Sequence, residues 1–213
     1  MFSDIVYDLL LGFRKTLIIF FLTLIMSMPF GLLISFGSMS RFRPVRWLTR
    51  CFVWIIRGTP LMLQLFVVFY VPGLVFNVPM RNRLIATLIA FVINYGAYFS
   101  EIYRGGIESI SLGQYEAGYV LGMTRSQVFF KVVLAQVVKR VLAPVSNEVI
   151  TLVKDTALAR VISEAEIIMV AERYAKSGLI WPLFFTGVYY LVFSGLLSVF
   201  FAFLEKKLEY YRG

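Results

Sequence analysis

Histidine is absent from the 213 residues of this chain, and cysteine occurs once, at Cys51. The first absence removes the commonest general base and metal ligand of proteins. The second excludes an intramolecular disulfide and a cysteine framework for a metal ion. No serine or threonine is clearly paired with a base, so the residues disfavour an enzyme. An intramembrane enzyme that acts on a lipid or a peptide is nevertheless kept as the alternative to a protein without catalytic activity.

A glycine followed by a lysine is also missing throughout the chain. The phosphate-binding loop of many ATPases, G-x-x-x-x-G-K-[ST], requires that pair because its lysine reaches the phosphates. The chain therefore has no such loop, and we expect it to bind no cofactor.

Charge is scarce as well. Only 15% of the residues are charged, whereas 60% are hydrophobic and 17% aromatic; a soluble domain has about 25% charged residues. Four stretches without charge are each close to the roughly 20 residues that a spanning helix needs: Thr16–Ser38, Gly58–Met80, Leu84–Ser100 and Leu179–Leu204. The first is too long for the apolar region of a signal peptide, and no small-x-small cleavage site follows it.

A fifth segment, Val141–Val170, is mostly apolar but contains six charged residues: Glu148, Lys154, Asp155, Arg160, Glu164 and Glu166. A charge at the bilayer centre costs roughly 2.5–3.5 kcal/mol. We therefore expect this segment to be broken, or to face a protein interior or a water-filled path. The sequence thus predicts an all-α integral membrane protein with five transmembrane helices in a single domain, residues 1–213.

Basic residues predict the orientation, because cytoplasmic loops are enriched in Lys and Arg. With the N-terminus outside and the C-terminus inside, twelve basic residues lie in inner loops and six in outer ones. The inner set is Arg41, Arg43, Arg46, Arg50, Arg104, Arg125, Lys131, Lys139, Arg140, Lys206, Lys207 and Arg212. We attribute the net charge of +9 to these loops and their attraction to anionic membrane lipid, and not to nucleic-acid binding.

The polar stretch Ser111–Gln136, "SLGQYEAGYVLGMTRSQVFFKVVLAQ", lies in the predicted cytoplasmic loop between spans three and four. Its segments Ser111–Gln114 and Thr124–Gln127 both match the capping box S/T-x-x-E/Q. Gly122 stands where a left-handed helix end favours glycine. We predict a helix from about Leu112 to Leu121, a tight turn, and a second helix from Arg125. From local pattern alone, this could also be an ordinary loop without a partner.

Part of this stretch, "YEAGYVLGMTRSQVFFKVVLAQ", resembles the EAA loop of bacterial ABC-importer permeases, which follows EAA-x3-G-x9-I-x-L-P. Glu116, Ala117 and Gly118 take the EAA places, and Gly122 takes the glycine. Gly118 replaces the second alanine and Ala135 the final proline; the second change lets the helix continue. The resemblance implies that these four residues, Glu116 to Gly118 and Gly122, belong to a coupling helix seated in an ATPase subunit.

Three further blocks, in order, are similar to the polar amino-acid permease family, which includes histidine, arginine, glutamine and cystine importers: "IRGTPLMLQLF" (Ile56–Phe66), "NYGAYFSEIYRGGIESI" (Asn94–Ile110) and "SNEVITLVKDTALARVI" (Ser146–Ile162). The resemblance implies a permease subunit in the cytoplasmic (inner) membrane of a bacterium. Its partners would be ABC ATPase subunits that carry ATP and Mg, a second permease subunit in a homo- or heterodimer, and a periplasmic or lipid-anchored solute-binding protein. The solute would be an amino acid.

Glu148, Thr151 and Asp155 follow at i, i+3 and i+7 and therefore share one helical face. We expect this face to line the solute path, with Glu148 meeting an ammonium group. A structural ion pair with Lys154 or Arg160 is the alternative, since a buried acid needs a partner.

Gln64 and Asn94, each inside an apolar span, are further candidates for the path, or else hydrogen-bond neighbouring helices. Arg57, Gly58, Thr59 and Pro60 predict a helix break that forms part of a gate or is only a kink. An opine, a peptide fragment or an organic acid is the alternative solute.

Overall fold

The computed structural model describes residues 2–208, and throughout this range the regular structure is helical, without a strand. This confirms the predicted all-α class. The helices are α1 (Phe2–Ser38), α2 (Arg43–Arg57), α3 (Leu61–Phe76), α4 (Arg83–Glu108), α5 (Leu112–Val120), α6 (Arg125–Val128), α7 (Leu134–Asp155), α8 (Ile167–Lys176) and α9 (Trp181–Leu208). A π-helix, η1 (Phe129–Val133), joins α6 to α7, and a 3-10 helix, η2 (Thr156–Ile162), follows α7. Arg212, counted above in the inner set, lies outside the described residues.

Three helices, α1, α4 and α9, are long and apolar enough to cross a membrane. The pair α2 and α3 is a fourth candidate if it is taken as one broken span, and it bends by 104° at the break. Length and composition therefore indicate three or four spans among the described residues. The charged helix α7, which covers the first half of the fifth predicted segment, is too polar to qualify by this measure.

The break between α2 and α3 occurs at Gly58, Thr59 and Pro60, as the sequence predicts. Pro60 lies at the N-cap of α3 in an extended conformation (φ −63°, ψ 137°), where its missing N–H leaves no helical hydrogen bond unmade. The second predicted span, Gly58–Met80, is consequently a 16-residue helix, Leu61–Phe76, that leaves α2 at a steep angle. We call Gly58–Pro60 the elbow.

The fifth segment is broken as well. Helix α7 ends at Asp155, η2 ends at Ile162 and is followed by Ser163 in a left-handed conformation (φ 61°), and α8 starts after Glu166. The buried Glu166 carboxylate accepts hydrogen bonds from the backbone N–H groups of Ile168 and Met169, both at 2.8 Å. The buried Glu164 accepts one from Lys15 of α1 at 2.9 Å. Two of the six charges are thus held inside the protein, as the prediction allows.

Helix α4 forms the centre of the packing. It crosses α1 closely, because a Cβ atom on Gly31 of α1 would lie only 2.8 Å from the backbone oxygen of Gly96 in α4. The main core cluster joins α1, α3, α4, α7 and η2, with Phe20, Leu65, Phe91, Tyr95 and Leu152 among its fully buried members. This buried core therefore lies directly beside the elbow and the charged face of α7.

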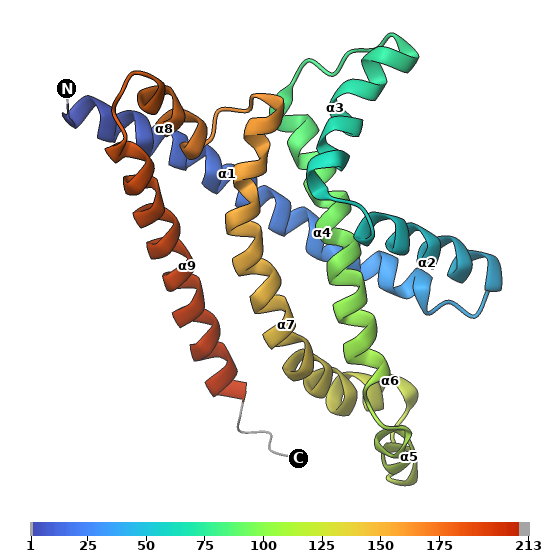
Figure 1. Cartoon of the computed structure of the whole chain (residues 1–213). Helices are drawn as coiled ribbons and strands as arrows, with labels where there is room; N and C mark the ends of the chain where they lie inside the picture. The colour runs from blue at the N-terminus through green and yellow to red at the C-terminus, as the bar shows by residue number, and fades with distance from the viewer. Residues whose placement is uncertain (1, 209–213) are drawn as a thin grey trace.

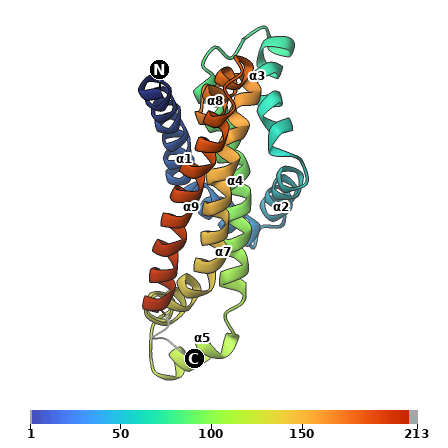
Figure 2. The same ribbon diagram turned by 60° about the vertical axis from the view of Figure 1, so that its left-hand side comes forward.

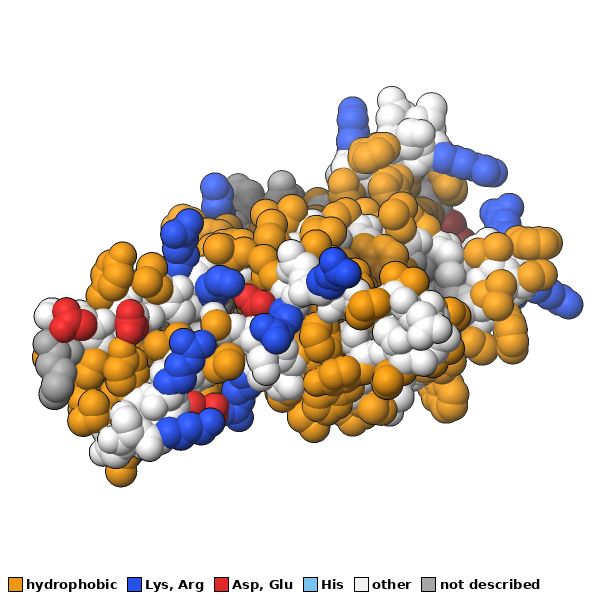
Figure 3. Space-filling model, turned by 90° about the horizontal axis from the view of Figure 1, so that it is seen from above, with side chains coloured by type: hydrophobic (Ala, Val, Ile, Leu, Met, Phe, Trp, Pro, Cys, Tyr) orange, Lys and Arg blue, Asp and Glu red, His pale blue; other side chains and the backbone are white. Residues whose placement is uncertain are grey.

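The two ends of the molecule carry different elements. The start of α1, helix α8 and the α3–α4 loop lie at one end, while α5, α6 and the end of α9 lie at the other (Figures 1 and 2). Seen from the first end, basic side chains stand among many hydrophobic ones and acidic side chains are few (Figure 3). The N-terminus and the polar loop 111–136 therefore occupy opposite ends.

Candidate functional site

A cavity of about 530 Å³ lies between the elbow, α4 and α7. Its lining residues are Arg57, Gly58, Thr59, Pro60, Leu61, Asn94, Tyr95, Tyr98, Glu148, Thr151, Asp155 and Leu158. Eight of the nine residues that the sequence analysis selected for a path or a gate are in this set. Three separate parts of the chain thus converge on one space.

Gln64 is the ninth residue, and it lies behind the cavity lining. Its amide nitrogen donates to the Ile56 carbonyl at 2.8 Å and to the Thr59 hydroxyl at 2.9 Å and carbonyl at 3.2 Å. Its amide oxygen accepts a hydrogen bond of 3.0 Å from Asn94 Nδ2. Gln64 therefore links the elbow to α4 and positions Asn94. This geometry agrees with the alternative in which the two side chains hydrogen-bond neighbouring helices.

Glu148 is half-buried in the cavity wall. The structural partners suggested by the sequence, Lys154 and Arg160, do not pair with it: Lys154 is exposed, and Arg160 pairs with Glu172 of α8. Among the described residues Glu148 has no ion pair within 4.0 Å, and the guanidinium lining the same cavity is that of Arg57. The structural ion pair, which the sequence left as the alternative, is therefore wrong for both residues: Lys154 is exposed, and the break after Asp155 takes Arg160 to Glu172 of α8.

Two tyrosines of the cavity were not singled out from the sequence. Tyr95 donates its hydroxyl hydrogen to Asp155 Oδ2 at 2.7 Å. The Arg57 guanidinium lies over the ring of Tyr98, 5.1 Å from its centroid, a cation–π geometry. Tyr98 is four residues after Asn94 and so shares its helical face, which is the signal that could have revealed it.

The cavity combines both charge signs with neutral hydrogen-bonding groups. Glu148 and Asp155 offer carboxylates, Arg57 offers a guanidinium, and Asn94, Thr151 and Tyr98 add polar atoms. No group of three or more metal-ligating residues occurs in the part of the chain that the structure describes. The arrangement suits a small polar solute that carries opposite charges.

The polar loop forms the second candidate site. Helix α5 ends in a Schellman motif, since Met123 N–H donates to the Gly118 carbonyl (3.1 Å) and Gly122 N–H to the Tyr119 carbonyl (2.9 Å). Gly122 has φ +74°, which confirms the predicted left-handed turn.

The second capping box is present: Thr124 Oγ1 accepts from Gln127 N–H at 3.3 Å, and Gln127 Oε1 accepts from Thr124 N–H at 2.8 Å. The predicted capping box at Ser111 is wrong, because the Ser111 side chain makes no capping hydrogen bond. The Gln114 amide oxygen instead accepts from Gln136 Nε2 at 3.0 Å. The helix that starts at Arg125 continues through Ala135, as expected, but passes through the π-helix η1.

The four residues matched to the EAA pattern differ in environment. Glu116, Ala117 and Gly122 are exposed, whereas Gly118 is buried. Large apolar side chains beside them also face outward, including Val120 (86% exposed) and Leu121 (79%). The loop therefore presents a mixed apolar and acidic surface without a covering element in the described chain.

A family model described as "Binding-protein-dependent transport system inner membrane component" matches residues 15–210. The L-cystine transport system permease protein TcyB of Bacillus subtilis (strain 168) is 38% identical, over 94% of this chain and 86% of its own length. The arginine transport system permease protein ArtQ of the same organism is 32% identical, over 93% and 91%. A solved structure described as the crystal structure of an amino acid ABC transporter with histidines has a TM-score of 0.88, 27% identity and coverage of 97% of this chain and 96% of that one.

These findings confirm the resemblance drawn from the sequence motifs. Members of the matched family are the membrane-embedded permease subunits of ABC transporters, and ATP is hydrolysed by a separate subunit. Family membership also implies a solute-binding partner. The chain therefore belongs to the family of binding-protein-dependent transport system inner membrane components, as an integral membrane permease subunit that is not itself an enzyme.

Proposed function

We propose that this chain carries an amino acid into a bacterial cell through the cavity between the elbow, α4 and α7. The observation that carries the proposal is the convergence of Arg57, Asn94, Glu148 and Asp155 on one space of about 530 Å³. An amino acid carries an ammonium and a carboxylate group at neutral pH. A site with a carboxylate on one wall and a guanidinium on another pairs with both groups.

Glu148 is the residue for the ammonium group or for a cationic side chain. It is half-buried and has no ion pair within 4.0 Å among the described residues. An acid in a low-dielectric site is costly until a cation neutralises it, and the solute supplies that cation. Asp155 already accepts a hydrogen bond from Tyr95, so its carboxylate is held in place as a second acidic wall.

Arg57 and the elbow form the opposite wall. Arg57 is the last residue of α2, and its guanidinium lies over Tyr98 of α4. Gln64 ties the elbow backbone to Asn94. A movement of α2 against α3 therefore changes the distance between Arg57 and Glu148, and we assign Arg57–Pro60 the role of a gate.

Helix α5 transmits the movement to the ATPase. Its exposed Glu116 and Ala117, with Val120 and Leu121, form the surface that enters a groove of the ATPase subunit. Gly118, packed against Val128, and Gly122, with its positive φ, set the shape of this loop. ATP and Mg remain on the partner, and a second permease subunit, identical or different, completes the pathway.

The basic residues and the two ends of the molecule support the proposed placement in the membrane. We infer five crossings in the cytoplasmic membrane, in which α2–α3 count as one and α7 with η2 as another. The N-terminus then lies outside, where a periplasmic or lipid-anchored binding protein delivers the solute. Helix α5 lies inside with the end of α9, an arrangement supported by their common end in Figures 1 and 2.

The test is transport by the assembled system. The ligand of the partner binding protein is identified by calorimetry, and uptake of that ligand is measured in vesicles that contain this chain with its ATPase. ATP-dependent uptake of an amino acid is the expected result. Uptake restricted to an opine, a peptide or an organic acid would contradict the solute class alone, whereas no uptake of any bound ligand would contradict the transport role.

A further inference from the structure

Helix α2 carries its arginines in a single stripe. Arg43, Arg46, Arg50 and Arg57 are separated by three, four and seven residues, spacings that keep side chains on one helical face. The helix contains no Asp or Glu. Trp47 (65% exposed) and Trp54 (77%) stand beside the stripe and are themselves seven residues apart. The surface is therefore basic with an aromatic border.

The orientation of α2 also separates it from the other long helices. It bends by 104° away from α3 and lies across the direction of α4, α7 and α9 (Figure 1). Leu48 and Ile55, on the side away from the arginines, are exposed apolar residues. A helix with one basic face, one apolar face and flanking tryptophans is typical of helices that lie in the bilayer interface.

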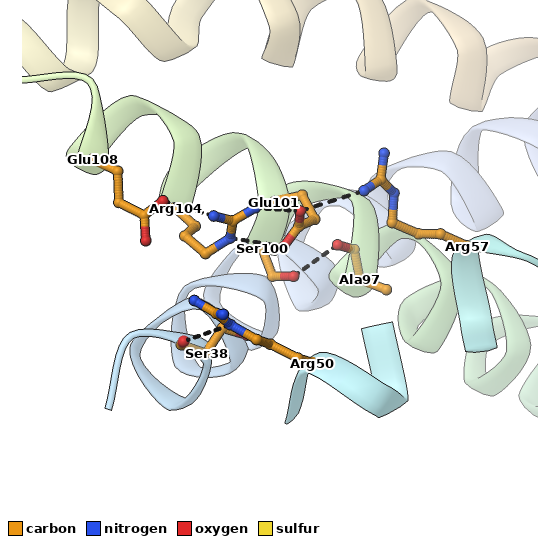
Figure 4. A network of polar contacts seen from close by, with 8 residues as sticks. All are labelled: Ser38, Arg50, Arg57, Ala97, Ser100, Glu101, Arg104 and Glu108. Atoms are coloured by element: carbon orange, nitrogen blue, oxygen red, sulfur yellow. Dashed lines mark hydrogen bonds and ion pairs between the residues drawn. The ribbon is translucent and has the colours of Figure 1, made fainter. Parts of the chain in front are cut away.

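The stripe borders a cleft of about 460 Å³ against α4, and Arg50, Arg57, Arg104 and Glu101 are among its lining residues. Arg57 and Arg104 contact Glu101, whereas Arg50 points to Ser38 (Figure 4). Arg104 uses its guanidinium on Glu101, with contacts of 3.0 and 2.6 Å, and on Glu108 at 2.6 Å. Arg57 reaches Glu101 only at 3.5 Å. Arg50 donates to the Ser38 carbonyl at 3.3 Å. The cleft thus keeps an excess of positive charge.

These groups match the chemistry of a phosphate diester. Guanidinium groups bind phosphate oxygens in bidentate fashion, and the positions of Arg50 and Arg46 on successive turns offer two such groups. The exposed Trp54 in the cleft wall, with Trp47 beside the stripe and the apolar residues Leu48 and Ile55 on the opposite face of α2, favours a phosphate that is attached to acyl chains. A soluble inorganic anion would make no contact with this aromatic border, whereas the acyl chains of a lipid would.

We propose that the arginine face of α2, with its cleft against α4, binds the headgroup of an anionic phospholipid. Placing that lipid in the cytoplasmic leaflet rests on the proposed orientation, but the binding itself does not. The lipid then holds α2 at the membrane surface, and the elbow follows directly after the last residue of α2.

The experiment uses the complete transporter, purified in detergent and supplied with phosphatidylglycerol or phosphatidylcholine. Native mass spectrometry measures the lipid retained, and a photoactivatable phosphatidylglycerol maps the contact. We expect preferential retention of phosphatidylglycerol and labelling within residues 43–57. Each arginine near an anionic lipid contributes about fivefold to binding, so Arg46→Gln with Arg50→Gln should reduce retention roughly 25-fold.

The matched control is Arg81→Gln with Arg83→Gln, which removes the same charge from exposed positions at the start of α4, outside the arginine stripe and its cleft. It should retain phosphatidylglycerol like the wild type. If the double variant in α2 fails to assemble, Arg50→Lys keeps the charge but removes the bidentate geometry, and its retention should fall several-fold.

Three results would overturn the proposal. They are unchanged retention in an assembled α2 variant, labelling that maps outside α2 and the cleft, and complete displacement of the lipid by inorganic phosphate, which would make the cleft a site for small anions. Since none of these measurements involves solute or ATP, failure of this proposal leaves the transport function to its own test.

Discussion

Gly118 of α5 lies directly against Val128 of α6. A Cβ atom built on Gly118 would lie 2.6 Å from Val128 Cγ2, well inside van der Waals contact. This explains why the chain has glycine where the EAA pattern has a second alanine: the two short helices of the polar loop 111–136 approach too closely for a methyl group. The glycine at position 118, which departs from the EAA pattern, therefore leaves the space that the Val128 side chain occupies.

The first prediction tests this contact. Gly118→Ala should push α5 away from α6 and reduce solute-stimulated ATP hydrolysis several-fold, because the methyl group overlaps Val128. Adding Val128→Ala should restore the space and most of the stimulation. The measurement is ATPase activity of the reconstituted complex with and without loaded binding protein. Full activity of the single variant would show that the loop tolerates a wider separation.

The turn at Gly122 gives the second prediction, and there the constraint is the backbone. Gly122 has φ +74°, and a Cβ atom on it would have no neighbour within 4 Å. A left-handed conformation costs most residues roughly 1–2 kcal/mol, whereas asparagine tolerates it better. Gly122→Arg should therefore abolish stimulation by solute while leaving the protein in the membrane, and Gly122→Asn should keep most of it. Equal activity of the two variants would contradict this reading of the turn.

The third prediction concerns the cavity. Glu148→Gln should preserve assembly and basal ATP hydrolysis but lower uptake at least tenfold, most strongly for a basic amino acid, because the amide cannot neutralise a cation. Glu205→Gln, at the opposite end of α9 from Trp181, is the matched control. If Glu148→Gln prevents assembly while the residual complexes transport normally, Glu148 has a structural role instead.

The fourth prediction separates positioning from contact. Gln64→Met keeps the volume but leaves the carbonyls of Ile56 and Thr59, and the amide of Asn94, without their partner. An unpaired buried polar group costs about 1–3 kcal/mol, so the thermal unfolding temperature should fall by several degrees together with uptake. Asn94→Ala should lower uptake with a smaller change in unfolding temperature. A larger fall in unfolding temperature for Asn94→Ala than for Gln64→Met would show that Asn94, and not Gln64, stabilises the elbow more.

The fifth prediction tests the orientation. In a Cys51→Ser background, cysteines at Asp4 and Arg173 should react with an impermeant thiol reagent added outside the cell. Cysteines at Arg43 and Lys207 should react only after permeabilisation. All four positions are exposed on the described chain, so access depends on the side of the membrane. Reversal at any two sites would overturn the N-out, C-in arrangement.

The sequence correctly predicted the structural features that depend only on residues close together in the chain. The turn at Gly122 and the capping box of Thr124 and Gln127 depend on neighbours within a few residues, and both are present. The same pattern failed at Ser111, where the Gln114 amide is hydrogen-bonded to Gln136, 22 residues away. A capping box is recognisable from sequence only when no distant side chain competes for its groups.

The cavity shows the same division. Helical spacing and sequence motifs selected Asn94, Glu148 and Asp155, and the fold brings them to one space. The 104° angle of the bend at the elbow could not be predicted from the sequence, because composition gives the apolar length of a segment and not its direction. The contact of Tyr95 with Asp155 spans 60 residues, and no local signal marks it.

The π-helix η1 sets an angular relationship between the two candidate sites. It lies between the capped start of α6 and helix α7, so its five residues set the rotation of α7 about its own axis relative to α5 and α6. Each residue of a helix advances the side-chain direction by about 100°. A π-helical turn closes i→i+5 hydrogen bonds, so η1 holds one residue more than an α-helical turn would in the same place. An insertion or deletion that this turn cannot absorb would rotate Glu148 away from the cavity without changing any residue of α7. In this segment, therefore, the number of residues constrains the protein as well as their identity.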